Sequence, residues 1–266
     1  MTIEEFRRRH RPRAVRAGGQ TWRVIETKAA HGAPVLVMLP GTLGTAEIFW
    51  NQIAALQKRA RIVSVTYPIV DDILKLADGL AALFDRLGIV KASVIGSSMG
   101  GYLAQWFAAR HAGRVETLYI TCSLSDPSMV NPAKLSPDAL RRAPAAMHRT
   151  IVLGSVKSWP EPEPVFRRLK AILDHSGHRL MTASALKARV LATATGKEVP
   201  PPALPQSRTV IIECADDPLI PRAAQRAMRR KYPRAKLYRL PRGGHYPYIT
   251  RAADFTKIVA RHLPRG

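Results

Sequence analysis

The chain reads Val94-Ile95-Gly96-Ser97-Ser98-Met99-Gly100-Gly101 and continues with a helical pattern over residues 102–107. An apolar run, a glycine-rich turn and a helical pattern in this order predict a strand that turns tightly into a helix. The turn has the spacing Gly-x-Ser-x-Gly, which is typical of a nucleophile elbow with Ser98 at its apex. Gly96 and Gly100 lack a Cβ, which would collide there with the neighbouring strand or helix. The turn therefore predicts a serine hydroxyl that is presented by a strained backbone.

Strand and helix patterns alternate on both sides of this turn. An unbroken apolar run predicts a buried strand at 35–39, and further strands are expected at 22–27, 61–66, 92–95, 115–121, 208–214 and 236–240. Amphipathic patterns between them predict helices, of which the clearest begins at Asp71 or Asp72 and ends at Gly88. Alternation at this spacing produces right-handed βαβ crossovers. The sequence therefore predicts an α/β fold with a doubly wound, mostly parallel sheet.

The alternation stops between residues 123 and 205, where prolines punctuate several helical patterns and no strand is expected. We interpret 123–205 as a helical cap that is inserted into a core formed by 21–122 and 206–266. Residues 1–20 carry a dense run of arginines ahead of the first expected strand. This segment is predicted to be a basic, mobile N-terminal arm.

Charge is the unusual feature of the composition, because 42 Lys and Arg residues against 19 acidic residues give a net charge of +23. Such a balance favours weak contacts with anionic surfaces. The basic residues are mostly scattered, and no aromatic and basic module accompanies the arginine run, so no nucleic-acid partner is expected. Cys122 and Cys214 each follow an apolar run and are predicted to be buried free thiols, without metal-ligand spacing. The sequence lacks a signal-peptide pattern and a membrane-spanning run, which predicts a cytoplasmic location.

A serine hydroxyl needs a base to act as a nucleophile, and the base needs an acid to orient it. His245 follows two glycines after the strand expected at 236–240, and Asp217 follows the strand expected at 208–214. Like Ser98, both lie past the carboxyl end of a parallel strand, where open α/β sheets bind ligands. Asp217 is the preferred acid. Asp216 and Asp126 are the alternatives, and each has the simpler interpretation of a turn or capping residue.

The tetrahedral intermediate of acyl transfer needs two preorganised backbone N–H donors for its oxyanion. One is expected to be the amide of Met99, directly after the serine. The other is expected from the loop at 40–44 after the first buried strand, where Thr42 is the predicted donor. The same residues also fit an ordinary glycine turn.

With these residues identified, the chain resembles the α/β-hydrolase superfamily, and in particular its maspardin branch. The blocks at 96–105 and 243–248 carry the resemblance most specifically, and the remaining matches are Gly41-Thr42, Ala46–Trp50, Thr66–Pro68, Asp78-Gly79, Ser123–Asp126 and Ile151–Gly154. The resemblance implies an α/β-hydrolase fold with an inserted cap. Maspardin is regarded as an interaction protein and has asparagine where this chain has His245. Maspardin also lacks the motif at 216–221 in this form, so the chain departs from it toward an intact Ser-Asp-His triad.

The sequence thus predicts a serine hydrolase of the carboxylesterase type that acts on a small-to-medium acyl ester through an acyl-enzyme. Thioesters, lactones and carbon–carbon bonds are alternative substrates for the same residues. A serine at position 98 argues against haloalkane dehalogenases and epoxide hydrolases, which use an aspartate. The rival prediction is a non-catalytic binding protein on the same fold. The expected partner is a small acyl substrate, with neither cofactor nor metal, and both a monomer and a homo-oligomer fit the sequence.

Overall fold

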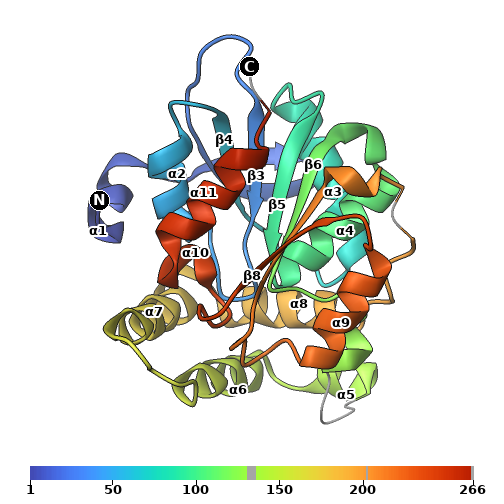
Figure 1. Cartoon of the computed structure of the whole chain (residues 1–266). Helices are drawn as coiled ribbons and strands as arrows, with labels where there is room; N and C mark the ends of the chain where they lie inside the picture. Colours follow the sequence, from blue (N-terminus) through green and yellow to red (C-terminus); the bar gives the residue numbers. More distant parts are fainter. Residues whose placement is uncertain (131–135, 202, 265–266) are drawn as a thin grey trace.

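A computed structural model describes residues 1–130, 136–201 and 203–264. Eight strands form one sheet in the order β1-β2-β4-β3-β5-β6-β7-β8 (Figure 1). Their bounds are β1 Arg13–Ala17, β2 Gln20–Glu26, β3 Val35–Leu39, β4 Arg61–Thr66, β5 Ala92–Ser97, β6 Val115–Thr121, β7 Thr209–Cys214 and β8 Lys236–Leu240. β2 pairs antiparallel with β1 and β4, and every other pair is parallel. The predicted α/β architecture with a mostly parallel sheet is confirmed.

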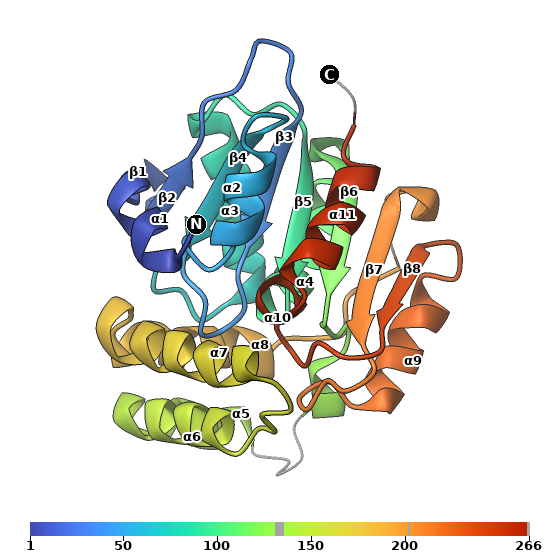
Figure 2. The same ribbon diagram turned by 60° about the vertical axis from the view of Figure 1, so that its left-hand side comes forward.

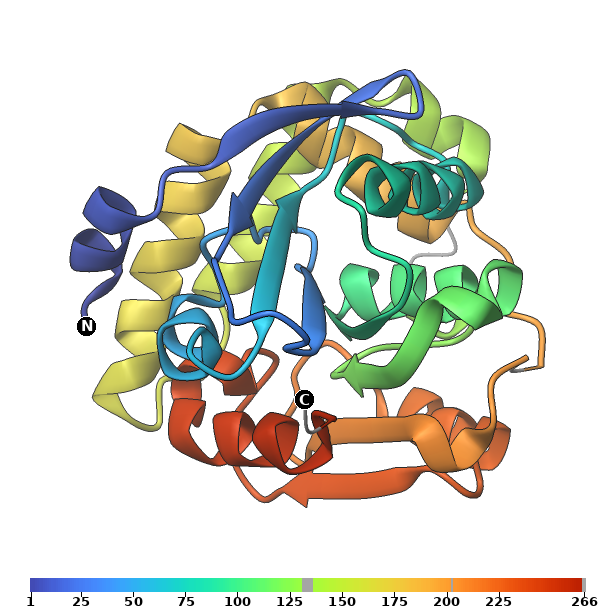
Figure 3. The ribbon, with the colours of Figure 1, turned by 90° about the horizontal axis from the view of Figure 1, so that it is seen from above.

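Helices cover both faces of the sheet, as the view from above shows (Figure 3). One face carries α2 (Trp50–Leu56), α10 (Pro247–Thr250) and α11 (Ala252–His262), and the other carries α3 (Ile73–Arg86), α4 (Met99–Arg110) and α9 (Arg222–Lys231). Each face has its own apolar core, because central strands alternate their side chains between the two layers.

Helix α3 illustrates how the local sequence determines where an element begins and ends. Asp72 caps α3, since its carboxylate accepts from the amides of Leu74 at 2.8 Å and Lys75 at 3.1 Å. The chain leaves the helix through Gly88, whose φ of +63° favours glycine. Of the two predicted caps, the structure selects Asp72.

The chain between β6 and β7 is helical and has no strand within its described residues. It contains α5 (Pro137–Arg142), α6 (Ala145–Lys157), α7 (Pro164–His175) and α8 (Ala183–Ala194), which we call the inserted helices. A π-helical turn, Ser176–Leu180, joins α7 to α8. Figure 2 shows the inserted helices gathered at one end of the sheet, next to the loop that follows β3. This is the end at which the parallel strands finish.

The first twenty residues differ from the mobile arm that was predicted. They form α1 (Ile3–Arg9), which Thr2 caps, and β1, which pairs with β2. Ile3 and Phe6 are 1% and 0% exposed, and Arg7 forms an ion pair with Glu47 at 2.5 Å. Two apolar side chains three residues apart thus bury one face of a short amphipathic helix, although arginines dominate the composition around them.

Across the described part of the chain, none of the helices is long and apolar enough to cross a membrane.

Candidate active site

Ser98 lies between β5 and α4 in a backbone conformation that side chains seldom adopt, with φ of 53° and ψ of −122°. The two flanking glycines make this turn possible. A Cβ on Gly96 would lie 2.0 Å from the carbonyl oxygen of Gly100, and a Cβ on Gly100 would lie 2.1 Å from the carbonyl oxygen of Leu39. The predicted collisions with helix and strand are therefore present at both positions. Strain of this kind is typical of functional turns.

His245 and Asp217 form a buried pair on the loops that follow β8 and β7. His245 Nδ1 lies 3.0 Å from each carboxylate oxygen of Asp217, and the side chains are 1% and 0% exposed. Asp217 Oδ1 also accepts from the amides of Leu219 at 2.8 Å and Ile220 at 3.0 Å. A carboxylate held in this way accepts the Nδ1 proton, which leaves Nε2 of the imidazole as the basic nitrogen.

The two alternative acids have other contacts. The carboxylate of Asp216 accepts from the amides of Gly244 at 2.9 Å and Gly243 at 3.1 Å, so it holds the loop that leads to His245. Asp126 accepts from the amide of Ser128 at 2.9 Å, a local turn contact. The structure therefore brings Asp217 to the imidazole, and Asp216 and Asp126 have the turn roles that were the simpler interpretation.

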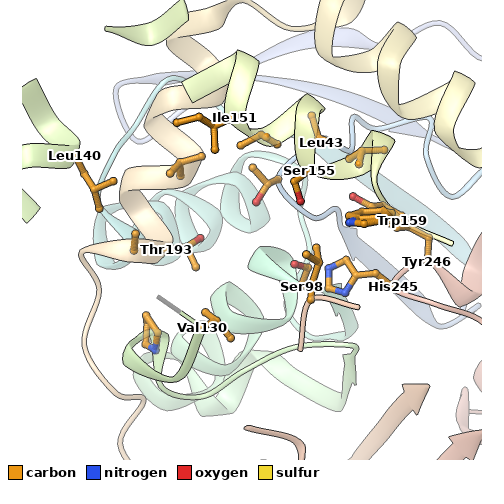
Figure 4. Close-up of a pocket in the computed structure, with 17 residues that line it drawn as sticks. Leu43, Ser98, Val130, Leu140, Ile151, Ser155, Trp159, Thr193, His245 and Tyr246 are labelled. Atoms are coloured by element: carbon orange, nitrogen blue, oxygen red, sulfur yellow. The ribbon is translucent and has the colours of Figure 1, made fainter. Parts of the chain in front are cut away.

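Ser98 and His245 share the wall of a cavity of about 440 Å³, and Figure 4 shows their side chains next to each other. The opposite wall comes mainly from α5, α6 and α8. The residues with apolar or aromatic side chains that line the cavity as a whole are Leu43, Pro127, Val130, Leu140, Ile151, Val152, Val156, Trp159, Val190, Ala194, Leu219 and Tyr246. No lysine, arginine or carboxylate belongs to the described lining. A cavity of this size and character suits an apolar organic ligand.

The loop at 40–44, which we call the β3 loop, lies against the elbow. A Cβ on Gly41 would approach the Ser98 Cβ to 3.2 Å, and Thr42 lines the cavity together with Ser98. Met99 supplies the first amide of α4. Among the described residues, neither the Thr42 amide nor the Met99 amide donates to a protein group. Thr42, in the cavity lining, and Met99, directly after Ser98, therefore each have an amide that no described protein group accepts.

Two cysteines lie behind the His245 loop. Cys122 has a φ of 41°, and its thiol lies 3.8 Å from the carbonyl oxygen of Gly244. A hydrogen bond with Cys214 and burial raise the pKa of the Cys122 thiol well above its ordinary value. Both cysteines are buried and free, as predicted. In the described part of the chain, no three potential metal ligands cluster.

Sequence reasoning missed Arg189 of α8, which contacts the β3 loop and is only 1% exposed. The signal was its spacing: Arg189 lies three residues after Leu186, on the apolar face of a helix. A charged side chain on a buried face is informative in itself.

Comparisons with known proteins agree with this fold. The sequence model of an alpha/beta hydrolase family matches residues 17–258 of this chain. The chain is 31% identical to maspardin from Homo sapiens over 231 residues, which is 86% of this chain and 74% of that protein. It is 27% identical over 202 residues to a pimeloyl-(acyl-carrier protein) methyl ester esterase from Chromobacterium violaceum, which is 71% of this chain and 74% of that protein. The structure also resembles an enol-lactonase from Burkholderia xenovorans, with a TM-score of 0.77 at 22% identity over 94% of this chain and 99% of that one.

Proposed function

The chain belongs to the alpha/beta hydrolase family, and on that premise we propose that it is a serine hydrolase of the carboxylesterase type. One observation carries the proposal: His245, paired with Asp217 at 3.0 Å, lies beside Ser98 at the wall of an apolar cavity. The chemistry of a nucleophile, a base and an orienting acid is therefore available at a site that can hold an acyl group.

In the proposed reaction, Ser98 Oγ attacks the acyl carbonyl while His245 Nε2 takes the hydroxyl proton. Asp217 holds the imidazole and stabilises the imidazolium that forms. The amides of Thr42 and Met99 donate to the negative oxygen of the tetrahedral intermediate. As the intermediate collapses, the carbon–oxygen bond to the leaving group breaks, and His245 protonates the departing alcohol. Water then attacks the acyl-enzyme in the same manner, releasing the acid and restoring Ser98.

The substrate is proposed to be an ester with a small-to-medium apolar acyl group. The cavity of about 440 Å³ has no ionised lysine, arginine or carboxylate among its described lining, which disfavours an acyl chain that ends in a charge. Similarity to proteins named as a methyl ester esterase and an enol-lactonase supports ester-like substrates. Thioesters and carbon–carbon bonds would use the same residues.

A fluorophosphonate probe tests the proposal directly, because it labels an activated serine. We expect the wild type to label, Ser98→Ala to remain unlabelled, and His245→Asn to label at least about 10³-fold more slowly. Ser155→Ala is the matched control, since Ser155 lines the same cavity from α6. An unlabelled wild type would refute the hydrolase proposal.

Relationship to maspardin supports one rival, a protein that binds a ligand in this cavity without turnover. That rival predicts an unlabelled wild type that nevertheless binds an apolar ester, measurable by calorimetry. Labelling of wild type but not of Ser98→Ala would exclude it.

A further inference from the structure

Arg189 is a cation buried without a carboxylate among the described residues. Its Nη1 donates to the carbonyl oxygens of Thr42 at 3.0 Å and Gly44 at 2.6 Å. Its Cζ lies 5.1 Å from the ring centroid of Tyr67, while Nε and Nη2 have no hydrogen-bond partner among the described residues. Burial lowers the pKa of the guanidinium to about 10, which still leaves it charged at neutral pH. Burying a charge with unsatisfied donors is costly, so its retention points to a role beyond packing.

The contacts of Arg189 complete a set that holds every carbonyl of the β3 loop. The five acceptors and their donors are Pro40 with the Tyr67 hydroxyl at 2.7 Å, Gly41 with the Gly44 amide at 2.9 Å, Thr42 and Gly44 with Arg189, and Leu43 with the Ser176 hydroxyl at 2.5 Å. Three of these bonds come from the chain between β6 and β7. The loop conformation is therefore set largely by the inserted segment rather than by the loop itself.

Fixed carbonyls also fix amides, because a peptide unit is planar and its N–H points opposite to its C=O. The Gly41 carbonyl thereby sets the direction of the Thr42 N–H, and the Thr42 carbonyl sets the next peptide plane. Without Arg189, two carbonyls of the loop would lose their donor at once. Donors to an oxyanion work only where they are held in place before the reaction.

We propose that Arg189 is a positioning residue that holds the β3 loop against the elbow, so that the Thr42 amide stays aimed at the oxyanion position beside Ser98. The inference rests on the proposed function. Arg189 does not belong to the described lining of the cavity, so its role is positioning rather than catalytic. It acts through the loop, and it makes the inserted helices part of the catalytic site. Removing Arg189 should therefore raise the free energy of the transition state more than that of the bound substrate, which lowers kcat and changes KM little.

The test compares three variants with a matched control. Arg189→Met removes the donors, Arg189→Lys keeps a charge and a donor, and Tyr67→Phe removes only the bond to the Pro40 carbonyl. The control is Arg149→Met, which removes an arginine of α6 that donates to the Met181 carbonyl at 2.8 Å and, among the described residues, to no carbonyl of the β3 loop. For a p-nitrophenyl ester, we expect kcat of Arg189→Met to fall about 10- to 100-fold with KM within about threefold.

Arg189→Lys and Tyr67→Phe should lie between wild type and Arg189→Met, and Arg149→Met should keep its kcat per folded molecule. A boronic acid, which forms a tetrahedral adduct with the serine, should lose affinity in parallel with kcat. If kcat of the folded Arg189 and Tyr67 variants equals that of Arg149→Met, the positioning role is overturned. Hydrogen exchange of the β3-loop amides gives a readout without turnover. Faster exchange in folded Arg189→Met than in folded Arg149→Met is expected, and equal exchange in the two variants would refute the role even if the wild type were not a hydrolase.

Discussion

The neighbouring carboxylates Asp216 and Asp217 permit the same substitution to be made at two adjacent positions with opposite expected results. In Asp217→Asn, the side-chain oxygen can still accept from the amides of Leu219 and Ile220, so the loop should persist. The new NH₂ group would face His245 Nδ1, which lies 3.0 Å away. An amide donor there favours the imidazole tautomer with its proton on Nε2, and that nitrogen then cannot accept the proton of Ser98.

The size of the effect follows from that change of tautomer. A carboxylate-to-amide change in a Ser-His-Asp triad lowers kcat about 10⁴-fold, or about 5.4 kcal/mol in activation free energy. In Asp216→Asn the loss is different, because each oxygen of Asp216 accepts from one glycine amide. The amide keeps one acceptor and loses the other, which should cost about 1 kcal/mol of unfolding free energy and less than about tenfold in kcat.

The assay is steady-state hydrolysis of a short-chain p-nitrophenyl ester, with urea unfolding of each variant to correct for folded protein. The expected pattern is a large kcat loss with Asp217→Asn and a mainly structural loss with Asp216→Asn. If Asp217→Asn retained more than about a tenth of the wild-type kcat, or if Asp216→Asn lost more of it, the assignment of the acid would be wrong.

Two further predictions concern the fold around the site. Phe6→Ala should lower the free energy of unfolding by about 3–5 kcal/mol, since Phe6 is fully buried. A urea titration measures this change. A loss below about 1 kcal/mol would contradict the docked helix and support a mobile N-terminal arm. The thiols of Cys122 and Cys214 should resist Ellman's reagent in the native protein at about pH 8, and both should react in denaturant. Both thiols are buried, and burial together with their mutual hydrogen bond raises the pKa of Cys122, which keeps this thiol protonated in the native protein. Rapid reaction of the native protein would contradict that.

The relation to maspardin gives these experiments their wider interest. The chain is 31% identical to maspardin from Homo sapiens over 86% of its length, and its His245 is paired with the buried carboxylate of Asp217. If the wild type hydrolyses esters, the same scaffold supports turnover in one branch. The inserted helices would then contribute both the apolar wall of the cavity and the support of the β3 loop.

Local sequence determined the elements and the places where they end. The elbow could be predicted because glycine is required wherever a Cβ would collide, and the structure shows contacts of 2.0 and 2.1 Å at Gly96 and Gly100. The positions of Asp217 and His245 followed from strand–helix alternation, since the carboxyl ends of parallel strands meet at one edge. These features depend on residues that are near one another in the chain.

Tertiary structure decided the features that depend on contacts between distant segments. The choice between Asp216 and Asp217 required knowing which carboxylate turns toward His245, 28 residues later. The docking of α1 depended on buried partners for Ile3 and Phe6, which the arginine-rich composition concealed. Arg189 reaches the Thr42 carbonyl across 147 residues. Periodicity and turn chemistry describe the chain over a few residues, whereas a hydrogen bond across the fold exists only once both of its segments are packed.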